Sequence, residues 1–142
     1  QKAPQPHALD EIPHTLTQET HLIMGKSAYE LKNKELAQKE FNQTIKIAQN
    51  EKAAEAKYML SQILYDNNKF DETEKSLLAL SDKYSSYDYW VAKGFILLSD
   101  VYVKKGNVFQ AKETLKSIID NYEGNDELVV TAREKLSRLS SK

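Results

Sequence analysis

Three histidines are the side chains in this sequence best suited to acid–base chemistry or metal binding near neutral pH. His7 and His14 lie in a proline-containing segment, without the cysteine or carboxylate neighbours at helical spacing that a metal site needs. His21 falls on the apolar stripe of a predicted helix, and no serine or cysteine stands near it to be activated. We therefore predict no catalytic residue and no metal site.

The carboxylate pairs and the glycines likewise give no indication of an active site. Asp71-Glu72 and Asp126-Glu127 stand where helices are predicted to begin, so the helix dipole accounts for them without catalysis. The four glycines form neither a P-loop nor a dinucleotide-binding pattern. The sequence predicts a non-enzymatic protein that needs no cofactor. The glycines are Gly25, Gly94, Gly106 and Gly124.

The bulk composition is that of one ordinary globular domain. The chain has 142 residues, of which 40% are hydrophobic and 29% charged, and its formal net charge is -1. Positive and negative residues are interleaved, so no basic surface for nucleic acid is predicted. The longest apolar runs are far shorter than the roughly 20 residues of a membrane span. With no cysteine, the sequence offers no disulfide and gives no indication of compartment.

The hydrophobic pattern between residues 90 and 122 predicts two amphipathic helices joined by a tight turn. Phe95, Leu98 and Tyr102 follow helical spacing, Lys105-Gly106-Asn107 interrupts it, and the spacing resumes from Val108. The resumed stripe consists of Val108, Ala111, Leu115, Ile118 and Ile119. This segment is predicted to be a helical hairpin.

The same hairpin recurs 38 residues earlier, and a weaker copy precedes that one by 36 residues. Leu60 corresponds to Leu98 and Leu77 to Leu115, and in the earlier copy Phe41 corresponds to Leu77. One hairpin has too small a core to fold alone, so about three stacked copies are expected. Small residues are predicted where paired helices approach closely: Gly25, Ser61, Ser99, Ala37, Thr73 and Ala111.

We predict an extended N-terminal arm or linker at residues 1–15 and one domain at residues 16–140. The domain contains hairpins at about 16–49, 51–84 and 88–122 and a final helix at about 126–139. Thr15 and Gln18 fit a capping box for the first helix, and either Asn68 or Asp71 caps the second helix of the second hairpin. Trp90 is expected to be buried between hairpins.

The order of large and small residues in the third copy resembles the tetratricopeptide repeat (TPR). The resemblance covers about residues 19–123, and the last helix resembles the solubilising cap of that family. In the first copy His21 and Ala28 stand where large apolar or aromatic residues are usual. The resemblance implies an all-α, right-handed solenoid of three TPR-like hairpins plus a C-terminal capping helix. The residues that carry it are Phe95, Leu98, Ser99, Tyr102, Ala111 and Leu115.

The resemblance also implies a protein-binding module whose concave face, lined by the first helix of each hairpin, holds a peptide or protein segment. Tyr58 and Tyr65 are the candidate anchors, with internal packing as the alternative. The lysine and asparagine clamp with which some TPR proteins hold a terminal carboxylate is absent, since Leu22, Lys26, Gln62 and Asp100 occupy its positions. The predicted face comprises Glu19, Leu22, Lys26, Tyr29, Glu55, Tyr58, Gln62, Tyr65, Lys93, Ile96, Asp100 and Val103.

An alternative function is that of a C-terminal structural or capping segment of a longer TPR solenoid, acting in self-association or envelope assembly. Repeat spacings of 36 and 38 residues resemble the lengthened TPRs of bacterial cell-envelope proteins. The resemblance favours the periplasm or the outer membrane over the cytoplasm. The partner is predicted to be another protein, or a second copy of this chain, and its identity is not predicted.

Overall fold

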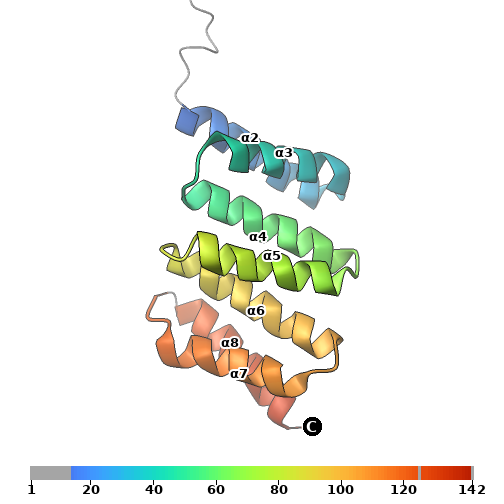
Figure 1. Cartoon of the computed structure of the whole chain (residues 1–142), viewed down its shortest axis with the longest axis vertical. Coiled ribbons are helices and arrows are strands. Elements are labelled where there is room, and N and C mark those ends of the chain that lie inside the picture. Colours follow the sequence, from blue (N-terminus) through green and yellow to red (C-terminus); the bar gives the residue numbers. More distant parts are fainter. Residues whose placement is uncertain (1–13, 125, 142) are drawn as a thin grey trace, which may run out of the picture. The chain divides into compact units, whose positions relative to one another are not determined.

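The computed structural model describes residues 14–124 and 126–141, and in these ranges the only regular secondary structure is helical (Figure 1). The all-α prediction is confirmed. The predicted arm falls outside the described residues up to residue 13, and its last two residues belong to the first helix. The helices are α2 (His14–Glu30), α3 (Lys34–Ile47), α4 (Glu51–Asp66), α5 (Phe70–Lys83), α6 (Asp88–Lys104), α7 (Val108–Asn121) and α8 (Asp126–Ser140).

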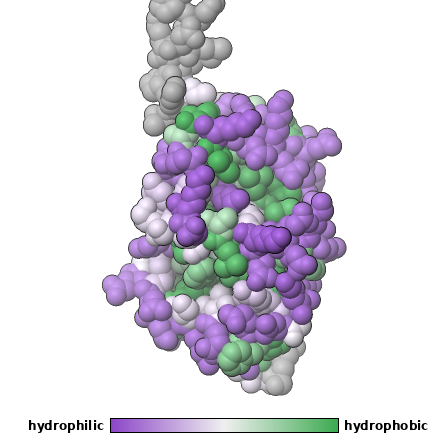
Figure 2. Space-filling model, viewed as in Figure 1, coloured by the Kyte–Doolittle hydropathy of each residue, from purple (hydrophilic) through white to green (hydrophobic). Residues whose placement is uncertain are grey.

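The described chain divides into two compact units. The first ends at Ala56 and the second begins at Lys57, so the boundary falls inside α4. Most exposed side chains are hydrophilic, and hydrophobic residues reach the surface as small patches between them, as Figure 2 shows for one face. The amphipathic helices predicted from the sequence account for this distribution.

In the first unit, α2 and α3 pack through a glycine. A Cβ atom added at Gly25 would lie 2.6 Å from the ring of Phe41, closer than two carbon atoms can approach. Phe41 and Ala37 of α3 are both completely buried. The predicted close approach at Gly25 and Ala37 is confirmed, because the absence of a side chain on α2 leaves room for the aromatic ring.

Gln18 has a role that the sequence analysis did not predict. Its side chain is fully buried, and its Nε2 donates hydrogen bonds of 2.9 Å to the carbonyl oxygens of Thr44 and Ala48. Its Oε1 accepts a 2.8 Å hydrogen bond from Asn50 Nδ2. The capping role assigned to Gln18 is therefore wrong, since the amide instead ties α2 to the end of α3 and to the start of α4.

A second polar contact joins the same two helices. His21 Nδ1 lies 2.5 Å from Glu40 Oε1, and Glu40 is almost completely buried. The pair satisfies a carboxylate that would otherwise be costly to bury. His21 thus has a structural role in the contact between α2 and α3.

Each hairpin turn contains one residue in the left-handed region of backbone conformation. These residues are Lys32, Asn68 and Gly106, with φ of 66°, 63° and 81°, and they stand 36 and 38 residues apart, as the repeats do. The helix ends adopt the Schellman arrangement, in which two backbone N–H groups satisfy carbonyl groups of the last turn. In this arrangement one hydrogen bond joins residues five positions apart in the sequence. These bonds run from Asn33 N to Ala28 O, from Lys69 N to Leu64 O, and from Asn107 N to Tyr102 O, at 2.8–3.0 Å.

The helix that follows each turn is capped in two of the three copies. The side chain of Asn33 accepts from Leu36 N, and that of Asn107 accepts from Gln110 N, both at 3.1 Å. In the second copy the cap position is held by Lys69, whose side chain makes no capping hydrogen bond. Both alternatives offered for this cap are therefore wrong. Asn68 occupies the left-handed position instead, and Asp71 lies one residue inside α5 and pairs with Lys105.

Lys32→Gly is expected to raise the free energy of unfolding of the first unit by about 1 kcal/mol. A lysine in the left-handed region carries a steric cost that glycine lacks. Urea denaturation followed by amide exchange in α2 and α3 measures the change. The matched control Lys39→Gly, at an exposed position inside α3, should destabilise by about 1 kcal/mol. A destabilising Lys32→Gly would show that the lysine side chain makes a compensating contact.

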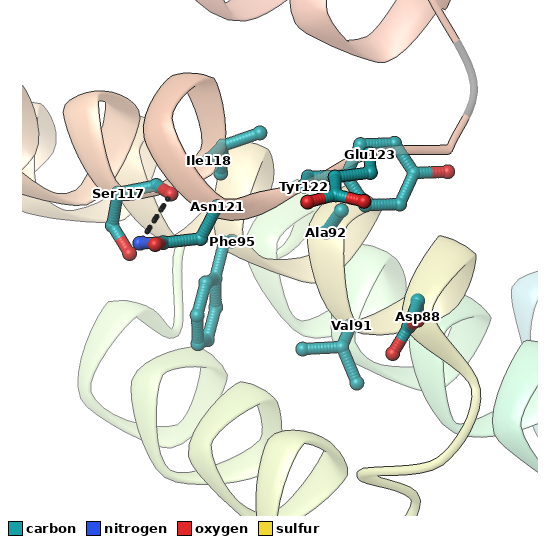
Figure 3. A pocket seen from close by; sticks show the side chains of 9 residues that line it. All are labelled: Asp88, Val91, Ala92, Phe95, Ser117, Ile118, Asn121, Tyr122 and Glu123. Atoms are coloured by element: carbon teal, nitrogen blue, oxygen red, sulfur yellow. Dashed lines mark hydrogen bonds between the residues drawn. The ribbon is translucent and has the colours of Figure 1, made fainter.

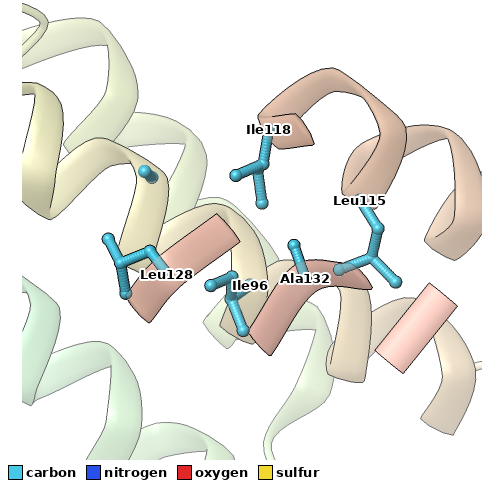
Figure 4. Close-up of a cluster of buried hydrophobic side chains, with 6 residues drawn as sticks. Ile96, Leu115, Ile118, Leu128 and Ala132 are labelled. Carbon is cyan, nitrogen blue, oxygen red and sulfur yellow. The ribbon is translucent and has the colours of Figure 1, made fainter. Parts of the chain in front are cut away.

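In the second unit, α6, α7 and α8 share one core cluster (Figure 4). α6 contributes Ala92 and Ile96, and α8 contributes Leu128 and Ala132, which lie against two apolar side chains of α7. The predicted final helix therefore covers the apolar face of the third hairpin. The two side chains of α7 are Leu115 and Ile118.

Small residues also mediate contacts between α4 and α5 and between α5 and α6. The hydroxyl of Ser61 lies 2.7 Å from that of Ser76, and both α4 and α5 can approach because these side chains are short. A Cβ atom at Gly94 would lie 2.9 Å from Leu80. Gly94 is thus a close-approach position that the repeat pattern did not indicate, because its counterparts in the other copies are not glycine.

Candidate protein-binding surface

The second unit brings six of the predicted binding residues together on two helices. Tyr58, Gln62 and Tyr65 recur every three or four residues along α4, and Lys93, Asp100 and Val103 occupy one face of α6. We call these six residues the α4–α6 surface. Ile96, on the same face of α6, is buried in the core cluster and supports the surface from below.

Three aromatic rings surround the ammonium group of Lys93. Its Nζ lies 5.3 Å from the ring centre of Tyr58, 5.7 Å from that of Tyr89 and 5.4 Å from that of Trp90. Tyr89 and Trp90 meet edge to face with their ring centres 4.8 Å apart. Ring faces attract a cation, so this cluster fixes the Lys93 side chain on the surface of α6.

Trp90 lies against α4, as the sequence analysis expected, but it is only half-buried. Its ring centre is 5.9 Å from that of Tyr58. The expected burial between hairpins is only partly realised, since Trp90 lies in the first turn of α6 and part of the residue stays exposed. A half-exposed indole beside Lys93 adds a large aromatic area to the candidate surface.

Tyr58 is the most buried member of the α4–α6 surface, with 9% of the residue exposed. Its hydroxyl donates to Gln62 Oε1 at 3.4 Å, and Gln62 Nε2 donates to Asp66 Oδ1 at 2.9 Å. Burial, assisted by the negative charge of Asp100, raises the pKa of Tyr58 to about 12. Tyr58 therefore stays a neutral hydrogen-bond donor at any physiological pH.

This raised pKa makes the stability of the second unit depend on alkaline pH. An unfolded tyrosine loses its proton near pH 10, whereas folded Tyr58 keeps it up to about pH 12. The contribution of Tyr58 to the free energy of unfolding is fully present below pH 10. It falls by about 1.4 kcal/mol per pH unit as the pH rises from 10 to 12. Urea midpoints measured from pH 9 to 11.5 should fall less steeply in Tyr58→Phe than in the wild type. Equal slopes would contradict the assignment.

A small cavity of about 160 Å³ opens at the end of the α4–α6 surface. Tyr65, Asp100 and Val103 line it on one side, and α8 closes it on the other. Lys135 Nζ of α8 lies 3.0 Å from Asp100 Oδ1, so the last helix neutralises the carboxylate of α6. The remaining lining residues are Ser99, Lys104, Lys135, Arg138 and Leu139.

The α8 residues of this cavity were missed by the sequence analysis, which treated the last helix as a cap. A signal was present in the sequence, because Lys135 and Arg138 stand next to Leu136 and Leu139, two apolar residues at helical spacing in the last helix. A side chain at such a position reaches the rim of the covered face. The sequence could not show that these α8 residues would face α6, because that contact depends on how α8 packs against α6. The helical period alone does not determine this packing.

Comparison with known proteins gives two findings. Residues 95–125 match the family model described as Tetratricopeptide repeat. The chain also resembles the solved N-terminal domain of stress-induced protein-1 (STI-1) from C. elegans, at 16% identity and a TM-score of 0.66, over 87% of this chain and 98% of that one. The chain has the tetratricopeptide-repeat fold. No curated protein matches the sequence.

The TPR fold accounts for the helix pairing of both units. The matched segment runs from the middle of α6 past the end of α7, which is the hairpin from which the repeat was predicted. In the described part of the chain, no helix combines the length and apolar character needed to cross a membrane. Over the same residues, histidines and carboxylates nowhere gather in a group of three that could hold a metal ion.

The first unit carries the other predicted residues of the TPR face. Lys26 Nζ forms a 2.8 Å ion pair with Glu55 Oε2, so these two predicted contact residues satisfy each other. Leu22 is buried, Tyr29 is half-buried and Glu19 is exposed. Exposed or half-exposed residues of this kind can contact a partner, whereas Leu22 stabilises the unit.

Proposed function

We propose that the chain is a non-enzymatic TPR module whose α4–α6 surface binds a segment of another protein. One observation supports this most strongly. The half-exposed Tyr65 and the exposed Val103 line the same cavity, within a surface that also presents the aromatic cluster around Lys93. Fixed aromatic rings give contact area at low entropy cost, which is typical of protein interfaces.

The shape of the surface suits an extended segment that inserts one side chain. The cavity of about 160 Å³ is too small for a typical small-molecule ligand and has room for a single residue. Tyr65 is held at its edge by a T-shaped contact with Phe70, their ring centres being 5.4 Å apart. A positioned ring loses little freedom on binding. We propose that Tyr65 is an anchor and that Tyr58 supports it from inside the unit.

Site-specific cross-linking tests this proposal. A photoreactive benzophenone amino acid in place of Val103 should capture a partner protein, and peptide mapping of the adduct should identify the bound segment. The matched control places the same group at Phe109, an exposed aromatic residue of α7 outside the surface. Capture of the same segment from Phe109 with equal yield would contradict the proposal. An adduct with a second copy of this chain would favour the self-association alternative.

Tyr65→Ala is expected to weaken binding of the captured segment by about 1 kcal/mol or more, which is at least about a fivefold rise in Kd. Calorimetry with the purified segment measures the change. Phe109→Ala removes a more exposed aromatic side chain from another helix and should leave Kd unchanged. Unchanged binding by Tyr65→Ala would remove this residue from the site.

Three finer statements belong to the same proposal. The TPR domain extends over residues 16–140, and Glu19, Lys26 and Tyr29 of the first unit also contact a partner. The lengthened repeats favour a bacterial periplasmic or outer-membrane setting. Detection of the captured partner in one cellular fraction would decide the setting, and Tyr29→Ala, assayed like Tyr65→Ala, would test the first unit.

A further inference from the structure

A second cavity of about 270 Å³ lies at the open end of the α6–α7 hairpin, away from the turn at Gly106 (Figure 3). The first two turns of α6 meet the last turn of α7 there. The cavity shares no residue with the α4–α6 surface, and nothing in the proposed function uses it. Its apolar lining comes from Val91, Ala92, Phe95, Ile118 and Tyr122.

Hydrogen-bond acceptors surround this apolar lining. Asp88, at the start of α6, and Glu123, just after α7, both contribute exposed carboxylates. Asn121 Nδ2 donates to Ser117 O at 3.0 Å, which leaves the amide oxygen of Asn121 as a further acceptor. The cavity thus combines apolar walls with two negative charges and a neutral acceptor.

The positive partner for these carboxylates is absent from the described part of the chain. Neither Asp88 nor Glu123 takes part in an ion pair among residues 14–124 and 126–141. Favourable interaction with the helix dipole explains Asp88 at the first position of α6. It does not explain Glu123, which follows the negative end of α7.

We propose that this cavity is a second docking site and that it receives an arginine side chain of a partner protein. The aliphatic part of arginine packs against apolar walls while its guanidinium stays at the polar rim. A planar guanidinium offers five N–H donors, so it can serve two carboxylates and an amide oxygen together, which a lysine ammonium does less well. Its planar face also stacks on an aromatic ring such as that of Tyr122 or Phe95.

The size of the cavity agrees with one inserted side chain. A volume of about 270 Å³ lies just below the usual range for small-molecule pockets, and a single long side chain fills it. Arginine is enriched at the energetic centres of protein interfaces, whereas isolated exposed carboxylates attract it only weakly. The apolar walls are therefore what distinguishes this site from an ordinary acidic surface.

The test uses N-acetyl-arginine amide as the probe, titrated into the isotope-labelled chain and followed by NMR. We expect saturating chemical-shift changes at Val91, Phe95 and Asn121, with weaker binding of N-acetyl-lysine amide and weaker still of N-acetyl-norleucine amide. Removing both charges in the Asp88→Asn, Glu123→Gln double variant should weaken arginine binding about five- to tenfold. Unchanged amide shifts in the rest of the spectrum show that the variant is folded.

Three results would overturn this proposal: no shift change at the cavity, equal binding of the norleucine probe, or undiminished arginine binding by the double variant. The matched charge control is Asp82→Asn, Glu113→Gln, which removes two exposed carboxylates elsewhere in the second unit and should leave the titration unchanged. The α4–α6 surface takes no part in this titration, so either outcome leaves the proposed function untouched.

Discussion

Phe41→Ala is expected to lower the free energy of unfolding of the first unit by about 3–5 kcal/mol. The ring is completely buried and lies in the space that Gly25 leaves open on α2. Its removal loses the transfer free energy of the ring and leaves a cavity, which the rigid crossing of α2 and α3 cannot close. Loss of this much stability should melt the pair of helices under conditions where the wild type is folded.

Amide hydrogen exchange of α2 and α3 measures this effect directly, because it reports the first unit separately from the second. Leu31→Ala is the matched control, since Leu31 is 80% exposed at the end of the same hairpin. The control should change the unfolding free energy by less than about 0.5 kcal/mol. A loss below about 1 kcal/mol for Phe41→Ala would mean that the packing around Gly25 is not what holds the hairpin together.

Gln18→Leu is expected to cost about 3 kcal/mol or more. Leucine keeps the volume roughly constant but leaves the carbonyl groups of Thr44 and Ala48 and the amide of Asn50 without their hydrogen bonds. Each buried group that loses its partner costs about 1–3 kcal/mol. Part of this cost is recovered if Asn50 turns toward water.

Urea denaturation of the first unit provides the measurement for this second variant. Gln49→Leu changes an exposed glutamine of the same segment and should have an effect within about 0.5 kcal/mol. Equal effects of the two leucine variants would refute a structural role for the buried amide. Gln18→Glu offers a further check, because a buried carboxylate facing two carbonyl groups should be more disruptive than leucine.

The spacing of the repeats could be predicted because each hairpin needs apolar and small residues at the same positions to pack its two helices. Spacings of 36 and 38 residues, read from apolar side chains, recur in the backbone as the left-handed residues Lys32, Asn68 and Gly106. Glycine and asparagine indicate such a turn in a sequence because they adopt the left-handed conformation readily, whereas lysine does not. The left-handed conformation of Lys32 can be inferred only from its position in the repeat, since its residue type does not indicate a turn.

Contacts between residues far apart in the sequence could not be predicted in the same way. Gln18 fits a capping box when only neighbouring residues are considered, and its partners Thr44 and Asn50 become visible only when α2 and α3 are packed. Lys135 likewise reaches Asp100 across 35 residues. Side-chain pairs of this kind depend on helix rotation and crossing, which a hydrophobic stripe defines only to within one face.

The predicted binding face shows both what helical spacing can predict and what it cannot. Helical spacing correctly grouped Tyr58 and Tyr65 on one side of α4, but it could not tell which ring would be covered. Tyr58 is 9% exposed and lies against Trp90, whereas Tyr65 is half-buried at the edge of a cavity. Internal packing therefore describes Tyr58 better, and Tyr65 is left as the candidate anchor.

NMR chemical-shift mapping with the segment captured at Val103 tests the central claim most directly. If the α4–α6 surface is the binding surface, the largest shift changes will fall on Gln62, Tyr65, Lys93 and Val103, and they will be smaller in Tyr65→Ala at the same sub-saturating segment concentration. Largest changes on the exposed face of α7 around Phe109, with Tyr65 and Lys93 unaffected, would contradict the account.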